Sequence, residues 1–169
     1  KKTSNIELVQ MDGDSYQLLR PASQDEYAMM LAYYRERAIR AQVSTFAPAD
    51  VPALLIYPPN AELFHNSRKA LDSGSVPRPF AGLVGDYVNQ MNITEEDLHG
   101  TLHLNASNKL VQALMLVDDV VVLGASLELI YHTARLFSGR MLETVDVASS
   151  FRQTTESIHR LIRKNADEK

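Results

Sequence analysis

Cysteine is absent from this chain of 169 residues. Its absence excludes disulfide bonds, thiol catalysis, iron–sulfur clusters and zinc sites that need thiolate ligands. A basic stripe is also missing, because 17 Lys and Arg residues are spread among 21 Asp and Glu residues and the formal net charge is −4. We therefore expect no nucleic-acid partner.

The sequence also lacks a glycine-rich nucleotide-binding motif and a signal-peptide pattern. Gly124 follows an apolar run, but neither a G-x-G-x-x-G nor a G-x-x-x-x-G-K pattern surrounds it. The chain begins at Lys1-Lys2 without methionine, which indicates a domain of a larger protein, with room for a membrane anchor before Lys1. We expect no cofactor, and the localisation stays open between a cytoplasmic domain and an extracytoplasmic domain of a membrane-anchored protein.

What remains has the composition of one globular domain, with 45% hydrophobic and 22% charged residues. The predicted class is mainly α: a helical bundle with long C-terminal helices and a small N-terminal β-hairpin turning at Asp12-Gly13. We expect a single domain over residues 1–169, divided into a hairpin, helix and Pro-rich connector at 1–58 and a helical bundle at 59–169.

Capping residues and periodicity predict the individual helices. Ser23 and Glu26 form a capping box before a helix at 23–42, and Asn60 precedes a helix at 61–72 that Gly74 ends. A short helix is expected at 80–91, and Thr94 starts a region of helical periodicity that runs to the C-terminus. Between the first two helices, residues 53–57 (ALLIY) read as a short strand.

Residues 109–131 are nearly as apolar as a membrane span, but Asp118 and Asp119 in their middle exclude that interpretation. We predict one central helix from about 107 to 137, apolar on most sides. A polar stripe recurs every seven residues along it: Asn105, Gln112, Asp119, Ser126, Thr133 and Arg140. Asp118 falls on the apolar side and would need a partner such as Arg35, His103 or Tyr131. Alternatively, residues 119–124 form a buried strand of an α/β fold.

The last helix, at about 140–164, has a clear apolar face. We expect that face to be buried, with Leu142, Val145, Ala148, Phe151, Ile158 and Leu161. The opposite, solvated face carries Arg152, Glu156, Arg160 and Arg163.

Metal chemistry has only weak support. Glu96-x-x-His99 and Glu156-x-x-His159 have the spacing of di-iron bundles, for which Glu36 and Glu128 would complete the ligand set. Solvated helix faces explain both Glu–His pairs better, so we expect no metal. The same applies to His99 with His103, which lack the glutamate of a zinc helix, and to Arg152 with His159, a spacing common by chance. Asn92-Ile-Thr94 and Asn105-Ala-Ser107 are glycosylation sequons that caps and turns explain equally well.

No catalytic set converges in the sequence, and apolar surface is in excess. We therefore predict a non-catalytic protein-interaction or assembly module whose partner is another chain or a second copy, a homo-oligomer above all. The alternative is an extracytoplasmic ligand-sensing domain of a membrane-anchored signalling protein. The polar residues of most interest inside the fold are Asp118, Asp119, His103 and His132.

Overall fold

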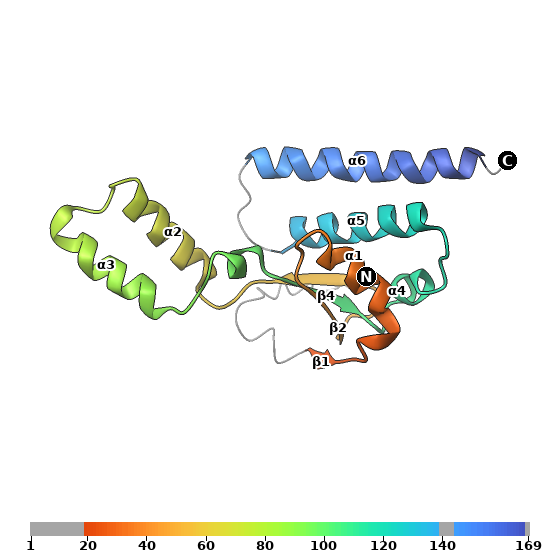
Figure 1. The fold of residues 1–169 in the computed structure, drawn as a ribbon, viewed down its shortest axis with the longest axis horizontal. Coiled ribbons are helices and arrows are strands. Elements are labelled where there is room, and N and C mark those ends of the chain that lie inside the picture. Colours follow the sequence, from red (N-terminus) through yellow and green to blue (C-terminus); the bar gives the residue numbers. More distant parts are fainter. Residues whose placement is uncertain (1–18, 139–143, 168–169) are drawn as a thin grey trace, which may run out of the picture.

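The computed structural model of the chain describes residues 19–138 and 144–167 (Figure 1). The expected hairpin at Asp12-Gly13 lies outside these residues, as do Arg140 and Leu142. The elements follow in the order β1 (Arg20–Pro21), η2 (Asp25–Tyr27), α1 (Ala28–Arg35), β2 (Ala41–Thr45), β3 (Ala53–Ile56), α2 (Ala61–Asp72), α3 (Arg78–Gln90), η3 (Glu96–His99), β4 (Thr101–Asn105), α4 (Lys109–Leu114), α5 (Val120–Leu136) and α6 (Thr144–Asp167).

The strands form one small mixed sheet in the order β1-β2-β4-β3. β4 lies between β2, to which it runs parallel, and β3, to which it runs antiparallel. Within β4, Leu102 and Leu104 point to one face and His103 to the other, as the period of two requires. The sheet joins strands that lie on both sides of residue 58 in the sequence.

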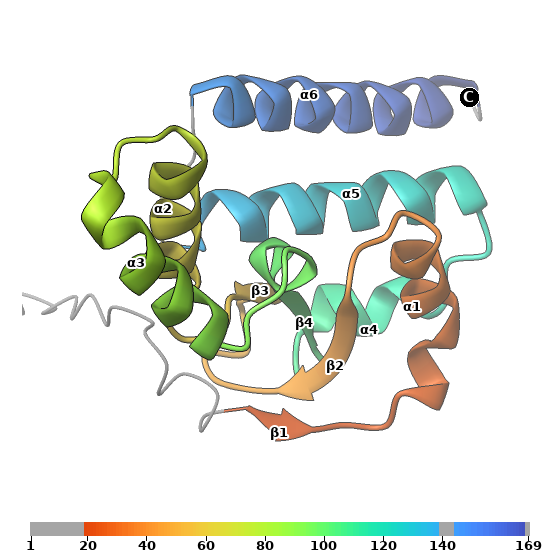
Figure 2. The same ribbon diagram turned by 60° about the vertical axis from the view of Figure 1, so that its left-hand side comes forward.

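The hydrophobic core lies between one face of this sheet and the helices α1, α4 and α5 (Figures 1 and 2). Its largest fully buried members include Tyr34 of α1, Leu102 and Leu104 of β4, and Leu127 of α5. The Tyr34 hydroxyl donates a hydrogen bond of 2.8 Å to the carbonyl of Leu127, which satisfies the buried polar group. Helix α6 forms a further layer outside α5 (Figure 2).

The apolar stretch 109–131 is two helices, so the predicted single helix at 107–137 is wrong. The physical reason is a pair of N-caps. Asn108 Oδ1 accepts hydrogen bonds from the backbone N–H groups of Leu110 and Val111 at the start of α4. Asp119 Oδ1 does the same for Val121 and Val122 at the start of α5. The alternative of a strand at 119–124 is also wrong, because α5 begins at Val120.

Two other predicted helices are shorter than expected. α1 ends at Arg35, and residues 41–45 form β2. The Ser23–Glu26 capping box does not form there; the Gln24 side chain instead exchanges two hydrogen bonds of 2.9 Å with the backbone of Val43. After Thr94 only the short helix η3 forms, and it ends at Gly100, whose φ of 72° does not continue a helix. Glycine is required there because a Cβ would lie 2.9 Å from the Ile56 carbonyl oxygen.

The helices α2 and α3 form an arm that stands to one side of the sheet and its covering helices (Figures 1 and 2). α2 begins after Asn60 and ends before Gly74, as predicted, and α3 confirms the expected short helix. The prediction that Asn60 caps α2 is wrong, because Asn60 is left-handed with φ 64° and its side chain makes no capping hydrogen bond. The arm packs mainly on itself and on η3, and it exposes Leu63, Phe80, Leu83 and Tyr87.

The fold is therefore mainly helical with a small mixed sheet, which agrees with the predicted class only at that coarse level. Among the described residues, no helix is both long enough and apolar enough to cross a membrane.

Candidate assembly surface

α5 and α6 run antiparallel, side by side (Figure 1). Two polar contacts fix their register. Lys164 Nζ lies 3.0 Å from Asp119 Oδ2 at one end, and Ser157 Oγ donates a hydrogen bond of 2.7 Å to Glu128 Oε2 nearer the middle. The C-terminal end of α6 is therefore level with the start of α5.

α6 meets α5 through small hydroxyl side chains. Ser150 and Ser157 are fully buried, and Thr154 and Leu161 are half-buried. We call Ser150, Thr154, Ser157 and Leu161 the docking face, because their spacing of four, three and four residues places them on one side of a helix. Of the docking face, the apolar pattern of the sequence predicted only Leu161.

The predicted burial of Phe151 and Ile158 is wrong. Phe151 is 61% exposed and Ile158 is 44% exposed, and Ala148 is exposed as well. With Ile162, which is 62% exposed, Phe151 and Ile158 form an apolar stripe along an exposed flank of α6, beside the docking face. The stripe runs from Phe151 to Ile162, twelve residues, or about 16 Å of helix. It differs from scattered exposed apolar residues because its members share one side of a single helix.

The α5–α6 contact leaves polar atoms without hydrogen bonds. Among the described residues, His132 Nδ1, Ser150 Oγ and Thr154 Oγ1 are buried and lack a hydrogen-bond partner. The antiparallel register brings His132 level with Ser150 and Thr154. Each such atom costs about 1–3 kcal/mol relative to a satisfied one. Burial lowers the pKa of His132, Glu128 opposes this shift and Arg135 adds to it.

A polar network near the middle of α5 joins α6 to both α5 and α1. Glu128 of α5 accepts hydrogen bonds from Tyr33 of α1 and from Ser157 and Arg160 of α6. We call these four residues the Glu128 cluster. Burial alone would raise the pKa of Glu128, but the three hydrogen bonds outweigh it and hold the pKa below its ordinary value. Burial and the bond to Glu128 raise the pKa of Tyr33 to about 12.

The two adjacent aspartates have different places from those predicted. Asp118 is exposed between α4 and α5 and needs no buried partner, so the prediction that it points into the apolar side of a helix is wrong. Asp119 caps α5, and its hydrogen bonds to Val122 and Lys164 lower its pKa. The seven-residue polar stripe is not one helix face, because Asn105 lies in β4, Gln112 in α4 and Ser126 in α5.

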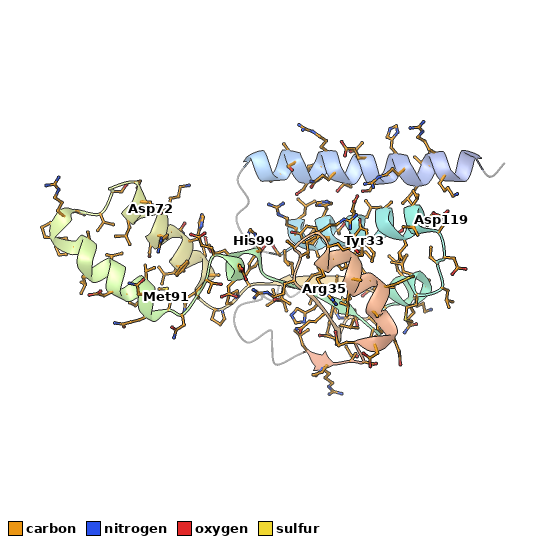
Figure 3. All side chains as sticks on the ribbon, viewed as in Figure 1. Tyr33, Arg35, Asp72, Met91, His99 and Asp119 are labelled. Atoms are coloured by element: carbon orange, nitrogen blue, oxygen red, sulfur yellow. The ribbon has the colours of Figure 1, made fainter. Side chains whose placement is uncertain are left out.

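The weak metal candidates stay apart. His99, labelled in Figure 3, is exposed on η3 with Glu96. Glu156 and His159 are exposed on α6. The described residues contain no group of three or more His, Asp and Glu side chains that could hold a metal ion. Glu36 is exposed, and Glu128 is engaged in its own cluster. Arg152 lies on the exposed surface of α6 with His159.

Two polar side chains of β4 are buried for structural reasons. His103 is 1% exposed, with Gln42 Nε2 and Ser44 Oγ each 3.1 Å from its Nδ1, and burial lowers its pKa to about 4. Asn105 is fully buried, and its amide donates to the carbonyls of Phe46 and Val51. The asparagine of this sequon therefore stabilises the neighbouring turns of the folded protein.

Sequence reasoning missed the docking face and the role of Tyr33. Hydroxyl residues inside an amphipathic helix carry no signal for burial, and the contact between Tyr33 and Glu128 joins residues 95 positions apart. Comparisons of the chain with protein-family models, with curated proteins and with solved structures found no match.

Proposed function

We propose that this domain is a non-catalytic self-assembly module in which the apolar stripe of α6 binds the α6 stripe of a second copy. The observation that carries the proposal is the orientation of α6. Phe151, Ile158 and Ile162 face solvent while Ser150 and Ser157 are buried. A helix whose only partner is α5 would bury its apolar residues against α5 and expose its serines.

A second copy suits this surface because it supplies an identical stripe. A two-fold axis pairs one patch with itself, and it is the commonest symmetry among soluble oligomers. Spacings of seven and four residues are those of helix seams that pack side chains into one another. Two α5–α6 pairs brought together along α6 make an antiparallel four-helix arrangement, a stable way to cover such seams.

The cost of the α5–α6 contact supports the same proposal. The unsatisfied atoms of His132, Ser150 and Thr154 weaken the docking of α6 within one chain. Burial of a large apolar side chain contributes about 1.5–3 kcal/mol. Covering the apolar stripe with a second copy would offset the weakness of the contact inside the chain.

The test is Ile158→Asp, measured by light scattering after gel filtration over a wide range of protein concentration. We expect the parent to associate as it is concentrated and the variant to weaken association by about 100-fold or more, because apolar contacts are lost from both copies. The matched control is His159→Asp, which adds the same charge beside the stripe at an exposed position. It should associate like the parent.

Circular dichroism decides whether the variant is folded, and Ile158→Asp should keep the helical signal because Ile158 is exposed. A parent that stays monomeric at every concentration would refute self-assembly. Association that survives both Ile158→Asp and Phe151→Asp would show that another surface carries it.

A further inference from the structure

α6 has two faces that could lie on α5. One is the docking face, and the other is the apolar stripe, turned from it by about 100° because Ser157 and Ile158 are neighbours in a helix. Hydrophobic burial by itself favours the stripe against α5. Since α6 instead presents Ser150 and Ser157 to α5, a specific interaction must hold it in that orientation.

The Glu128 cluster supplies such an interaction, and it uses both oxygens of the carboxylate. Tyr33 donates a hydrogen bond of 2.9 Å to Oε1. Ser157 donates one of 2.7 Å to Oε2, and Arg160 binds the same oxygen and also donates to Ser157 Oγ at 3.2 Å. Ser157 and Arg160 are three residues apart, so the carboxylate selects one side of α6.

Tyr33 is itself held by its neighbours, so the position of Glu128 is set from α1. The Arg37 guanidinium lies 3.6 Å from the centre of the Tyr33 ring, and the ring meets Tyr34 edge-on. On α5, Gly124 allows the close approach, because a Cβ there would lie 3.2 Å from the Tyr33 ring. The chain of contacts therefore runs from α1 through Tyr33 and Glu128 to α6.

We propose that Glu128, held by Tyr33, sets the rotation of α6 on α5 and so keeps Phe151, Ile158 and Ile162 facing outward. The proposal rests on the proposed self-assembly function, for which the outward stripe is the binding surface. Glu128 is a positioning residue, because it acts on the stripe through Ser157 and Arg160. Without it, α6 turns and buries its own stripe on α5, and the chain loses the surface that a second copy binds.

The absence of cysteine allows a direct measurement of this rotation. Ser150→Cys places a thiol at a fully buried position, and Phe151→Cys places one at a position 61% exposed. At dilutions where the chain is monomeric, a thiol reagent should label the Phe151→Cys variant rapidly and the Ser150→Cys variant slowly. Adding Glu128→Met should reverse this order, with labelling at Ser150→Cys faster by about tenfold, the effect of a 1.4 kcal/mol change in the balance of orientations.

The matched control is Glu156→Met, which makes the same replacement at an exposed position of α6 and should leave the labelling order unchanged. Arg160→Met removes one donor from the cluster and should shift the order in the same direction, by less. It also carries the test if circular dichroism shows that Glu128→Met does not fold.

The outcomes separate the two proposals. Reversal of labelling together with weaker association of Glu128→Met in light scattering supports both. If Glu128→Met reverses the labelling order but the parent never associates, the role of Glu128 is supported and self-assembly through the stripe is refuted. An unchanged order in Glu128→Met refutes the role of Glu128, and so does fast labelling at both positions, since α6 would then have detached instead of turned.

Discussion

Helix α5 has a different kind of neighbour on each side. Toward the sheet, Leu123, Leu127, Ile130 and Ala134 pack in a core in which the Tyr34 hydroxyl finds a carbonyl acceptor. Toward α6, the contact contains hydroxyls and a histidine nitrogen that are buried without hydrogen bonds, and it is held by the Glu128 carboxylate. The sheet side has the character of a permanent core, and the α6 side has that of a contact whose orientation is set by polar groups.

The largest effect should come from the sheet side. Leu127→Ala removes a fully buried side chain from the core, and we expect a loss of about 2–5 kcal/mol in the free energy of unfolding. Leu161→Ala makes the same change in the docking face, where the side chain is only half-buried, and should cost about 1 kcal/mol. Urea denaturation followed by circular dichroism measures both. Equal losses would contradict the difference between the two sides.

Acid should act next most strongly, through His103 in the sheet. Its pKa falls to about 4 in the fold because of burial, against about 6.5 when unfolded. Between pH 4 and pH 6.5 the unfolded chain binds more protons than the folded protein. The contribution of neutral His103 to the free energy of unfolding is therefore fully present above about pH 6.5 and is lost as the pH falls toward 4. At 1.36 kcal/mol per unit, the loss is about 3 kcal/mol. Denaturation curves at several pH values give the free energy of unfolding as a function of pH, and this free energy should change less with pH in His103→Gln than in the parent. An unchanged pH dependence would exclude His103 as the cause.

The smallest effect should have the opposite sign and come from the α6 side. Ser150→Ala and Thr154→Ala remove hydroxyls that are buried without hydrogen bonds, so each should leave stability unchanged or raise it by about 1 kcal/mol. Ser44→Ala is the control on the sheet side, because Ser44 Oγ lies 3.1 Å from His103 Nδ1 and its loss should destabilise the protein. Thermal unfolding distinguishes these signs. Destabilisation by Ser150→Ala would mean that its hydroxyl has a favourable contact.

Several elements could be predicted because their signals are local. The bounds of α2 could be predicted from short motifs, although Asn60 makes no capping hydrogen bond at its start. The same kind of local reasoning failed at residues 101–105, where alternation of Leu102, His103 and Leu104 is a strand signal that helical periodicity on either side obscured. The caps at Asn108 and Asp119 were visible in the sequence, but the apolar character between them favoured one long helix.

The candidate surface could be found only in part. An excess of apolar residues indicated an interaction surface either at residues 109–131 or on the C-terminal helix, and the sequence contains the pattern of Phe151, Ile158 and Ile162. Which face of that helix meets α5 depends on Glu128, and Glu128 is placed by Tyr33, 95 positions earlier in the chain. Helical periodicity describes the two faces of a helix and carries no information about which one a distant carboxylate selects.

Composition and local pattern thus determined that the chain is mainly helical, that it has no thiol chemistry and that its C-terminal helix is amphipathic. Tertiary structure alone decided that β4 inserts between β2 and β3 and that the apolar side of α6 faces outward. The reason is physical: capping and periodicity act within a few residues, whereas strand order and helix rotation are set by contacts between segments far apart in the chain.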